Sequence, residues 1–252
     1  MTTLRAERVT RRYGGLVAVQ AVDLHVSSGE VVGLIGPNGA GKTTLFACLS
    51  GAERLDEGSV RLDDRDITAL RADERSRLGL ARTFQRLAVF TTMTVEENLL
   101  AGAESRRPGS LRRSLLGRAE PTTGADRERV RDVASLLGLD AVLGQVAGSL
   151  STGGQRMVEL GRALCRDPRV LLLDEPASGL DTGETEELAR VLRHLAGEGT
   201  AVLLVEHDLG LVLSTADRLV AMAAGRVLAD GPPEEVRRDP AVRSAYLDRA
   251  AS

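Results

Sequence analysis

Long apolar runs are missing from this sequence. Runs such as Val170 to Leu173 and Ala201 to Val205 are far shorter than the roughly 20 apolar residues that a membrane-spanning helix needs. The first residues, Met-Thr-Thr-Leu-Arg-Ala-Glu, contain neither an apolar signal region nor a small-residue cleavage site. We therefore expect a chain without membrane spans that stays in the cytosol.

Cysteine is scarce, and the net charge is small. The two cysteines, Cys48 and Cys165, are far apart within apolar helical patterns, which favours reduced core thiols over a disulfide or a metal site. The formal net charge of −3 argues against a chain whose main task is to bind nucleic acid, because phosphate binding usually leaves a basic surface. A local basic patch remains compatible with this composition.

Lysine is almost absent. The sequence contains 33 lysine and arginine residues, and all of them except Lys42 are arginine. A chain that uses arginine elsewhere but keeps lysine here suggests a site that needs a compact ammonium group on a flexible stem.

The order of apolar segments indicates an α/β fold. Apolar strands at Val31 to Ile35, Val170 to Leu173 and Ala201 to Val205 alternate with helical stretches, the pattern of a parallel sheet covered on both faces. The first 30 residues and Ser59 to Asp63 instead form short alternating segments between glycine-containing turns, which predicts a small antiparallel sheet. At 252 residues, one domain with sub-lobes is expected.

The middle of the chain is predominantly helical, from about Thr94 to Leu164. Within it, the arginine-rich stretch from Ser105 to Gly124 predicts a surface loop or short broken helix, with a contact to lipid headgroups or to a partner subunit as the alternative. After strands around Gly225, we expect two short helices, opened by Pro232-Pro233 and by Asp239-Pro240.

A nucleotide site is predicted directly after the first apolar strand. The segment follows the pattern G-x-x-x-x-G-K-[ST] and consists of Gly36, Pro37, Asn38, Gly39, Ala40, Gly41, Lys42 and Thr43. A helix is expected from Thr44 to Leu49, so its positive end would face the same phosphates as the inward-pointing loop amides. Lys42 would reach the β- and γ-phosphates, and the Thr43 hydroxyl would bind Mg²⁺. This pattern alone does not distinguish kinases, GTPases and transport ATPases.

A second buried strand ends in two carboxylates, Asp174 and Glu175. Asp174 can hold the Mg²⁺ shell, and Glu175 can orient or deprotonate the attacking water. The alternative is that both are merely acids that cap a following helix.

Taken together, these motifs resemble the ABC ATPase family over essentially the whole chain. Ser151-Thr152-Gly153-Gly154-Gln155 occupies the place of the family's signature, although the family commonly has Gly at position 152 and Gln or Glu at position 154. The remaining matches are Gln85 (a glutamine that touches Mg²⁺ and water), Asp181 (in the loop that crosses the dimer interface), His207 (the switch histidine at the γ-phosphate) and Tyr13 (the aromatic that stacks on adenine).

The resemblance also implies an architecture and partners. It implies a P-loop ATPase (RecA-like) core with a mainly parallel sheet, an antiparallel β sub-lobe at about 1–30 and 55–70, and a helical signature sub-lobe at about 86–165. Two such domains would close around two ATP molecules, each P-loop completed by the other's signature, and would serve two transmembrane permease subunits and an extracytoplasmic solute-binding protein. The chain would then lie at the cytoplasmic face of the membrane.

The subfamily is indicated by three stretches, Gly79 to Gln85, Met93 to Leu99 and Pro240 to Leu247. They resemble the ATPases of branched-chain amino-acid importers, in particular the longer of the two ATPase subunits. The stretch from Arg86 to Thr94 would receive a permease helix, unless it packs in the core. Urea or amide importers, the lipopolysaccharide-export ATPase, a soluble ABC ATPase acting on nucleic acid or ribosomes, and a regulatory partner with little hydrolysis remain alternatives.

Overall fold

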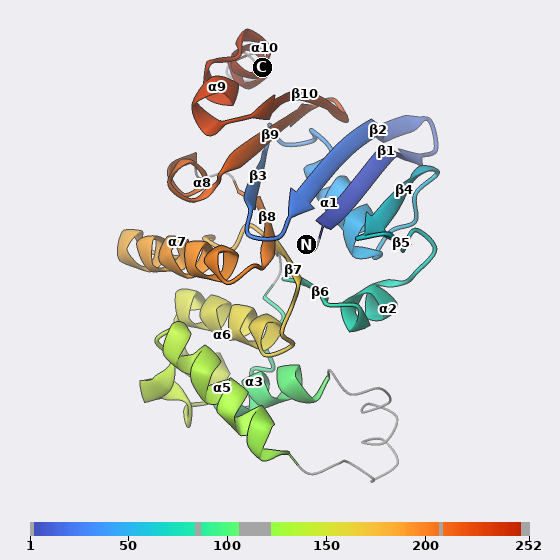
Figure 1. Cartoon of the computed structure of the whole chain (residues 1–252). Helices are drawn as coiled ribbons and strands as arrows, with labels where there is room; N and C mark the ends of the chain where they lie inside the picture. Colours follow the sequence, from blue (N-terminus) through green and yellow to red (C-terminus); the bar gives the residue numbers. More distant parts are fainter. Residues whose placement is uncertain (1–2, 84–86, 106–121, 207–208, 248–252) are drawn as a thin grey trace. The chain divides into compact units, whose positions relative to one another are not determined.

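The structure, a computed structural model, describes residues 3–83, 87–105, 122–206 and 209–247 (Figure 1). The chain divides into two compact units. The first unit comprises Met1–Arg82, Arg169–Glu175 and Glu186–Ser252, and the second comprises Thr83–Pro168 and Pro176–Thr185.

The first unit is built on a six-stranded sheet in the order β10-β9-β3-β8-β7-β6 (Figure 1). Its strands are β3 (Val31–Ile35), β6 (Leu80–Arg82), β7 (Val170–Asp174), β8 (Ala201–Val205), β9 (Arg218–Ala223) and β10 (Arg226–Gly231). All neighbouring pairs are parallel except β9 with β10. The three apolar strands predicted from the sequence are confirmed, and each is buried along its whole length, as expected for strands covered on both faces.

A four-stranded antiparallel sheet, in the order β2-β1-β4-β5, completes the strand content of the described first unit. Its strands are β1 (Thr3–Tyr13), β2 (Leu16–Ser27), β4 (Glu57–Leu62) and β5 (Arg65–Asp66). This sheet confirms the antiparallel sheet predicted from the turn-rich segments. One hydrophobic cluster includes buried residues of both sheets and of the helix after β3, for example Leu4, Leu34 and Phe46.

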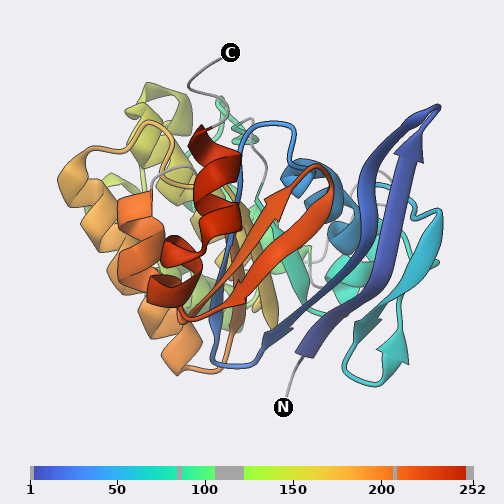
Figure 2. The ribbon, with the colours of Figure 1, turned by 90° about the horizontal axis from the view of Figure 1, so that it is seen from above.

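Five helices of the described residues lie wholly within the first unit, and all five are short. They are α1 (Lys42–Ser50), α2 (Ala72–Arg77), α8 (Leu209–Thr215), α9 (Pro233–Arg238) and α10 (Pro240–Leu247). The predicted helix after the glycine-rich loop is confirmed but begins two residues earlier, at Lys42. Both predicted C-terminal helices are present, and Figure 2 shows them beside the β9–β10 hairpin. A proline stands at the first position of each, where a missing N–H costs no helical hydrogen bond.

The second unit is helical where it is described, as predicted. It contains α3 (Val95–Glu104), α5 (Gly124–Leu136) and α6 (Thr152–Leu164), two short 3₁₀ turns (Asp140–Val142 and Ala147–Ser149), and the start of α7 (Thr182–Gly197), which continues into the first unit. Helix α3 packs against α5 and α6. A reciprocal cap begins α3, where the Thr94 hydroxyl accepts from the Glu97 amide and the Glu97 carboxylate accepts from the Thr94 amide. Most of the arginine-rich stretch from 105 to 124 lies outside the described residues.

Two compositional predictions can be checked directly. Cys48 and Cys165 are both buried and free, which confirms that they are core thiols. Among the described residues, we find no helix that is both long enough and apolar enough to cross a bilayer.

Candidate functional site

The glycine-rich loop leaves the carboxyl end of β3 in a conformation that only glycine adopts easily. Gly36, Gly39 and Gly41 have φ angles of 151°, 78° and 99°. A Cβ at Gly36 would lie 2.2 Å from the Met222 carbonyl oxygen, and one at Gly41 would lie 2.4 Å from that of Ala18. The backbone angle favours glycine at all three positions, and at Gly36 and Gly41 the close packing against neighbouring backbone is a second reason.

Lys42 is buried, and its ammonium group is held by the loop itself. Its Nζ donates to the carbonyl oxygens of Gly36 (2.5 Å) and Pro37 (3.2 Å). Helix α1 begins at this residue, and its N-cap is Gly41, which supplies no side-chain cap. The first amides of α1, with the positive end of the helix dipole, suit an anion such as a phosphate group. Thr43 is exposed at the same end of α1.

The two predicted carboxylates lie at the carboxyl end of β7. Asp174 is 1% exposed, and burial raises the pKa of its carboxyl group, while the positive charge of Arg82 opposes that shift. Glu175 adopts a φ of 50°, unusual for a residue with a side chain, and its amide donates to the Val205 carbonyl of β8 at 2.8 Å. Such strained backbone is typical of functional sites and here sets the direction in which the Glu175 side chain leaves the strand.

A magnesium ion fits the chemistry of these residues. Magnesium is usually bound by one or two carboxylates, with nucleotide phosphates and water supplying the remaining oxygens. Asp174 offers a buried carboxylate, where a negative charge is costly without a nearby cation. Thr43 offers a hydroxyl at the start of α1. Among the residues that the structure describes, no cluster of three or more His, Cys, Asp or Glu side chains forms an independent metal site.

A buried arginine that sequence reasoning missed closes the opposite end of α1. Arg75 of α2 donates Nη1 to the carbonyl oxygens of Cys48 and Leu49 (2.7 Å each), which are acceptors in the last turn of α1. Burial lowers the pKa of Arg75 to about 10. An arginine on a short polar helix gave no sequence signal for this role.

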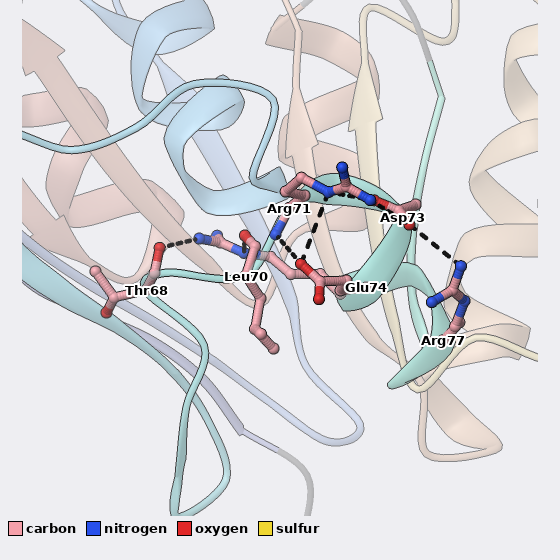
Figure 3. Close-up of polar contacts among 7 residues, drawn as sticks. Thr68, Leu70, Arg71, Asp73, Glu74 and Arg77 are labelled. Carbon is pink, nitrogen blue, oxygen red and sulfur yellow. Dashed lines mark hydrogen bonds and ion pairs between the residues drawn. The ribbon is translucent and has the colours of Figure 1, made fainter.

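The other polar groups of α2 form surface contacts, shown in Figure 3. The Glu74 carboxylate accepts from the Arg71 amide at 2.9 Å, and Asp73 pairs with Arg77 at 3.2 Å. The hydrogen bond and the ion pair are both exposed, and an exposed ion pair contributes little to stability, in contrast to the buried Arg75.

The predicted signature lies at the start of α6 in the second unit. Ser151 is the N-cap, and its hydroxyl accepts from the Gly154 amide at 3.0 Å. The Gln155 side-chain amide donates to the Leu150 carbonyl at 3.0 Å. A Cβ at Gly153 would lie 2.5 Å from a Glu184 carboxylate oxygen, so a larger residue at this position would displace the Glu184 side chain. The departures at Thr152 and Gly154 are compatible with a regular helix start.

Asp181 caps the next helix in the chain. Its Oδ1 accepts from the Glu184 amide at 2.8 Å, and the Glu184 carboxylate accepts from the Asp181 amide at 3.0 Å. Asp181 is exposed, as a residue at an interface between copies would need to be before assembly.

Tyr13 lies at the end of β1 and is 43% exposed. The Arg11 guanidinium carbon lies 4.6 Å from the centre of the Tyr13 ring, and Arg11 also pairs with Glu53 (3.0 Å) and Asp56 (3.4 Å). The ring is therefore held at the surface by a cation–π contact and is accessible for stacking. Arg11 was also missed from the sequence.

Two predicted site residues, Gln85 and His207, lie outside the described residues. Of the other residues, the structure brings the P-loop, Asp174 and Glu175 to the carboxyl ends of β3 and β7, which flank β8 in one sheet. Ligands of open α/β sheets bind at this edge.

Comparisons with known proteins agree with this geometry. The ABC transporter family pattern matches residues 19–178, and that of the branched-chain amino acid ATP-binding cassette transporters matches residues 226–247. The high-affinity branched-chain amino acid transport ATP-binding protein BraF of Pseudomonas aeruginosa is 41% identical, over 98% of both chains. The lipopolysaccharide export system ATP-binding protein LptB of Acidithiobacillus ferridurans is 39% identical, over 97% of this chain and 96% of its own.

Solved structures give the same result. The ADP conformation of MJ1267, an ATP-binding cassette of an ABC transporter, superposes with a TM-score of 0.87 at 33% identity, over 98% of this chain and 99% of that one. The fold, the P-loop and the full-length similarity lead to one conclusion: this chain belongs to the ABC transporter family, as an ATPase of the kind that hydrolyses ATP to power transport.

Proposed function

We propose that this chain is the ATP-hydrolysing subunit of an ABC importer for branched-chain or other hydrophobic amino acids, and that residues 1–252 act as one ATPase domain. The observation that supports the ATPase assignment is the loop from Gly36 to Lys42, which combines glycines at positive φ with a buried lysine at the start of a helix, an arrangement that suits a phosphate group. The match of residues 226–247 and the similarity to BraF support the amino-acid assignment.

ATP would bind along the edge of the six-stranded sheet. Tyr13 would stack on adenine, and the amides of the loop and of Lys42, Thr43 and Thr44 would donate to phosphate oxygens. To reach the β- and γ-phosphates, the Lys42 ammonium would exchange its contacts with Gly36 and Pro37 for phosphate oxygens. Thr43, Asp174 and Gln85 would hold Mg²⁺, which when bound neutralises charge that develops on the phosphates.

Glu175 would polarise the attacking water, and His207 would contact the γ-phosphate. The backbone of Glu175 is fixed by its hydrogen bond to β8, so the carboxylate is attached to a rigid strand end. A positioned base of this kind typically contributes about 100-fold to 10,000-fold in rate.

A second ATPase subunit would complete each site. Ser151, Gly153 and Gln155 at the start of α6, and the exposed Asp181, would face the nucleotide held by the partner, in a homo- or heterodimer. The positive end of α6 would stabilise the γ-phosphate charge. Two permease subunits and a solute-binding protein would supply the membrane path and the specificity, and this chain would be attached to the cytoplasmic face through the permeases.

Lipopolysaccharide export is the second candidate function. Its support is the 39% identity to LptB, close to the value for BraF. The site described above does not distinguish the two functions, because it handles nucleotide and not cargo. A urea or amide importer would use the same ATPase chemistry.

A single substitution tests the hydrolytic role. Glu175→Gln keeps the size of the side chain but removes the base, so we expect phosphate release to fall by about 100-fold or more while ATP binding is retained. Release of inorganic phosphate and equilibrium binding of a fluorescent ATP analogue would be measured on the same preparation. Normal turnover by this variant would contradict the assigned role.

Co-purification tests the transport assignment. The tagged chain would be isolated from gently solubilised membranes, and its partners identified by mass spectrometry. Two different polytopic proteins and a second, shorter ATPase are expected for the amino-acid importer. Recovery with ribosomes or nucleic acid would overturn the transport assignment while leaving the ATPase intact.

A further inference from the structure

Arg82, the last residue of β6, contacts parts of the site that are distant in sequence. Its Nη2 lies 3.5 Å from Asp174 Oδ2, and its Nη1 donates to the Ser50 hydroxyl at 2.9 Å. The guanidinium carbon lies 5.1 Å from the centre of the Phe46 ring. Ser50 and Phe46 belong to α1, the helix that begins at the P-loop, so Arg82 links that helix to the end of β7.

Both members of the Arg82–Asp174 pair are largely removed from water. The side chains are 15% and 1% exposed. Desolvation lowers the pKa of Arg82, and Asp174 is the charge that opposes this effect. Of the cations that lower the pKa of Asp174, Arg82 has a larger effect than Lys42. A buried carboxylate that loses such a partner pays a large desolvation cost.

Asp174 is also the carboxylate assigned above to Mg²⁺, so the inference rests on the proposed function. We propose that Arg82 is a positioning residue that balances the charge of Asp174 whenever the metal is absent, and that it shares this carboxylate with Mg²⁺ during the nucleotide cycle. The guanidinium is bound through Oδ2, and it is anchored to α1 independently through Ser50 and Phe46.

This arrangement has a thermodynamic consequence. Without Arg82, the nucleotide-free protein must keep the buried Asp174 carboxylate with less positive charge beside it, because Lys42 has a smaller effect than Arg82, whereas the metal-bound protein has a further cation there. Removal of the Arg82 charge should therefore destabilise the folded protein strongly without Mg²⁺ and only weakly with it. The reason is that Mg²⁺ and nucleotide bind the folded state and so stabilise it.

The experiment compares melting temperatures of the full chain in three conditions: without ligand, with ADP and a chelator, and with ADP and Mg²⁺. Arg82→Gln, which removes the charge, should lower the ligand-free melting temperature by roughly 6 °C or more. The increase in melting temperature from ADP with chelator to ADP with Mg²⁺ should then be larger for Arg82→Gln than for the wild-type chain. Arg82→Lys, which retains the charge, should give a gain close to wild type.

Two control variants separate charge from packing. Ser50→Ala removes a hydrogen bond of Arg82 but keeps its charge, and Arg77→Gln removes an exposed charge of α2. In both variants, Mg²⁺ should raise the melting temperature by as much as it does in the wild-type chain. If Arg82→Gln does not fold without ligand, its soluble yield after refolding with and without Mg²⁺ and ADP gives the same comparison.

The possible failures are distinguishable. Equal Mg²⁺ gains in Arg82→Gln and wild type, or an Arg82→Lys variant that behaves like Arg82→Gln, would overturn the role of Arg82. A wild-type chain whose melting temperature responds to neither ADP nor Mg²⁺ would overturn the proposed nucleotide function, and with it this inference.

Discussion

Two helices in this chain are predicted to direct their first amides at phosphate, and their beginnings differ. Helix α1 starts after Gly41 with no side-chain cap, and its first residue is the buried Lys42. Helix α6 starts with Ser151, whose hydroxyl already accepts from an amide of its own helix. Under the proposed function, a bound phosphate would take the capping role in α1, whereas in α6 the protein supplies a side-chain cap itself.

The difference is consistent with the two proposed roles. A nucleotide that resides on its own subunit can replace the cap of α1 for most of the cycle. The start of α6 would meet a nucleotide only while two subunits are closed, so it needs a cap for the remaining time. Serine suits this double use, because its hydroxyl can rotate between a helix amide and a phosphate oxygen.

The largest expected contrast comes from adding one methyl group at each helix start. Gly41→Ala places a Cβ 2.4 Å from the Ala18 carbonyl oxygen at a φ of 99°, so we expect a loss of about 1–3 kcal/mol in stability and at least a 100-fold loss in ATP affinity. Gly154→Ala places its Cβ 3.2 Å from Leu150 Cβ within a helix, where alanine is favoured by about 0.5–1 kcal/mol.

Equilibrium binding of ATP and denaturant unfolding of both variants measure this contrast. Gly154→Ala should bind ATP as the wild type does, with a stability change of less than about 1 kcal/mol. A Gly41→Ala variant that retains full ATP affinity would remove the distinction between the two helix starts.

A smaller contrast compares Ser151 with a matched cap in the same unit. Thr123 caps α5 by accepting from the Asp126 amide at 3.2 Å, as Ser151 caps α6. Substitution of either residue by alanine should cost about 1 kcal/mol of stability. Only Ser151→Ala should also reduce phosphate release, because only this hydroxyl is proposed to meet a nucleotide, and ATP binding by the isolated chain should not change.

The measurements are urea unfolding, ATP binding and phosphate release for both variants. Equal phosphate release by Ser151→Ala and Thr123→Ala would leave Ser151 with a structural role only, and would favour the regulatory alternative with little hydrolysis.

The sequence was most informative where neighbouring residues alone determine the local structure. The buried strands were predicted because residues covered on both faces must be apolar, and the P-loop because its glycines serve a backbone need that appears in the sequence itself. Helix α1 was predicted to begin at Thr44 and begins at Lys42, because the last two residues of the glycine-rich pattern also form the first turn of the helix.

The residues that were missed act through tertiary contacts. Arg82 and Arg75 are two of many arginines, and no spacing marks the carboxylate or carbonyl groups that they contact from other elements. Their burial follows from the sheet order, which brings β6 beside β7, and from the packing around the end of α1. A sequence pattern cannot supply this information because the partners are distant along the chain.

The smallest expected effect concerns the other ends of the two helices. Cys48 lies in the last turn of α1, and Cys165 follows the last residue of α6. Burial raises the pKa of the Cys48 thiol to about 11 and that of Cys165 to about 12, from an ordinary value of 9.0. Burial thus favours the neutral thiol over the thiolate. The stability that comes from keeping each thiol neutral is fully present below pH 9, and it is lost as the pH rises toward 11 for Cys48 and 12 for Cys165.

At pH 8 we therefore expect neither thiol to react with a disulfide reagent in the folded chain, and both to react after denaturation. Labelling followed by mass spectrometry would identify which thiol reacts first under mild denaturant. Arg75 donates to two carbonyls at the end of α1, and Arg129 donates to the Leu164 carbonyl at the end of α6 at 3.0 Å. We expect Cys165 to be labelled first, because its helix end is held by fewer carbonyl contacts and so opens at lower free energy. Earlier labelling of Cys48 would contradict this order, and would mean that the Arg75 contacts stabilise the end of α1 less than the Arg129 contact stabilises the end of α6.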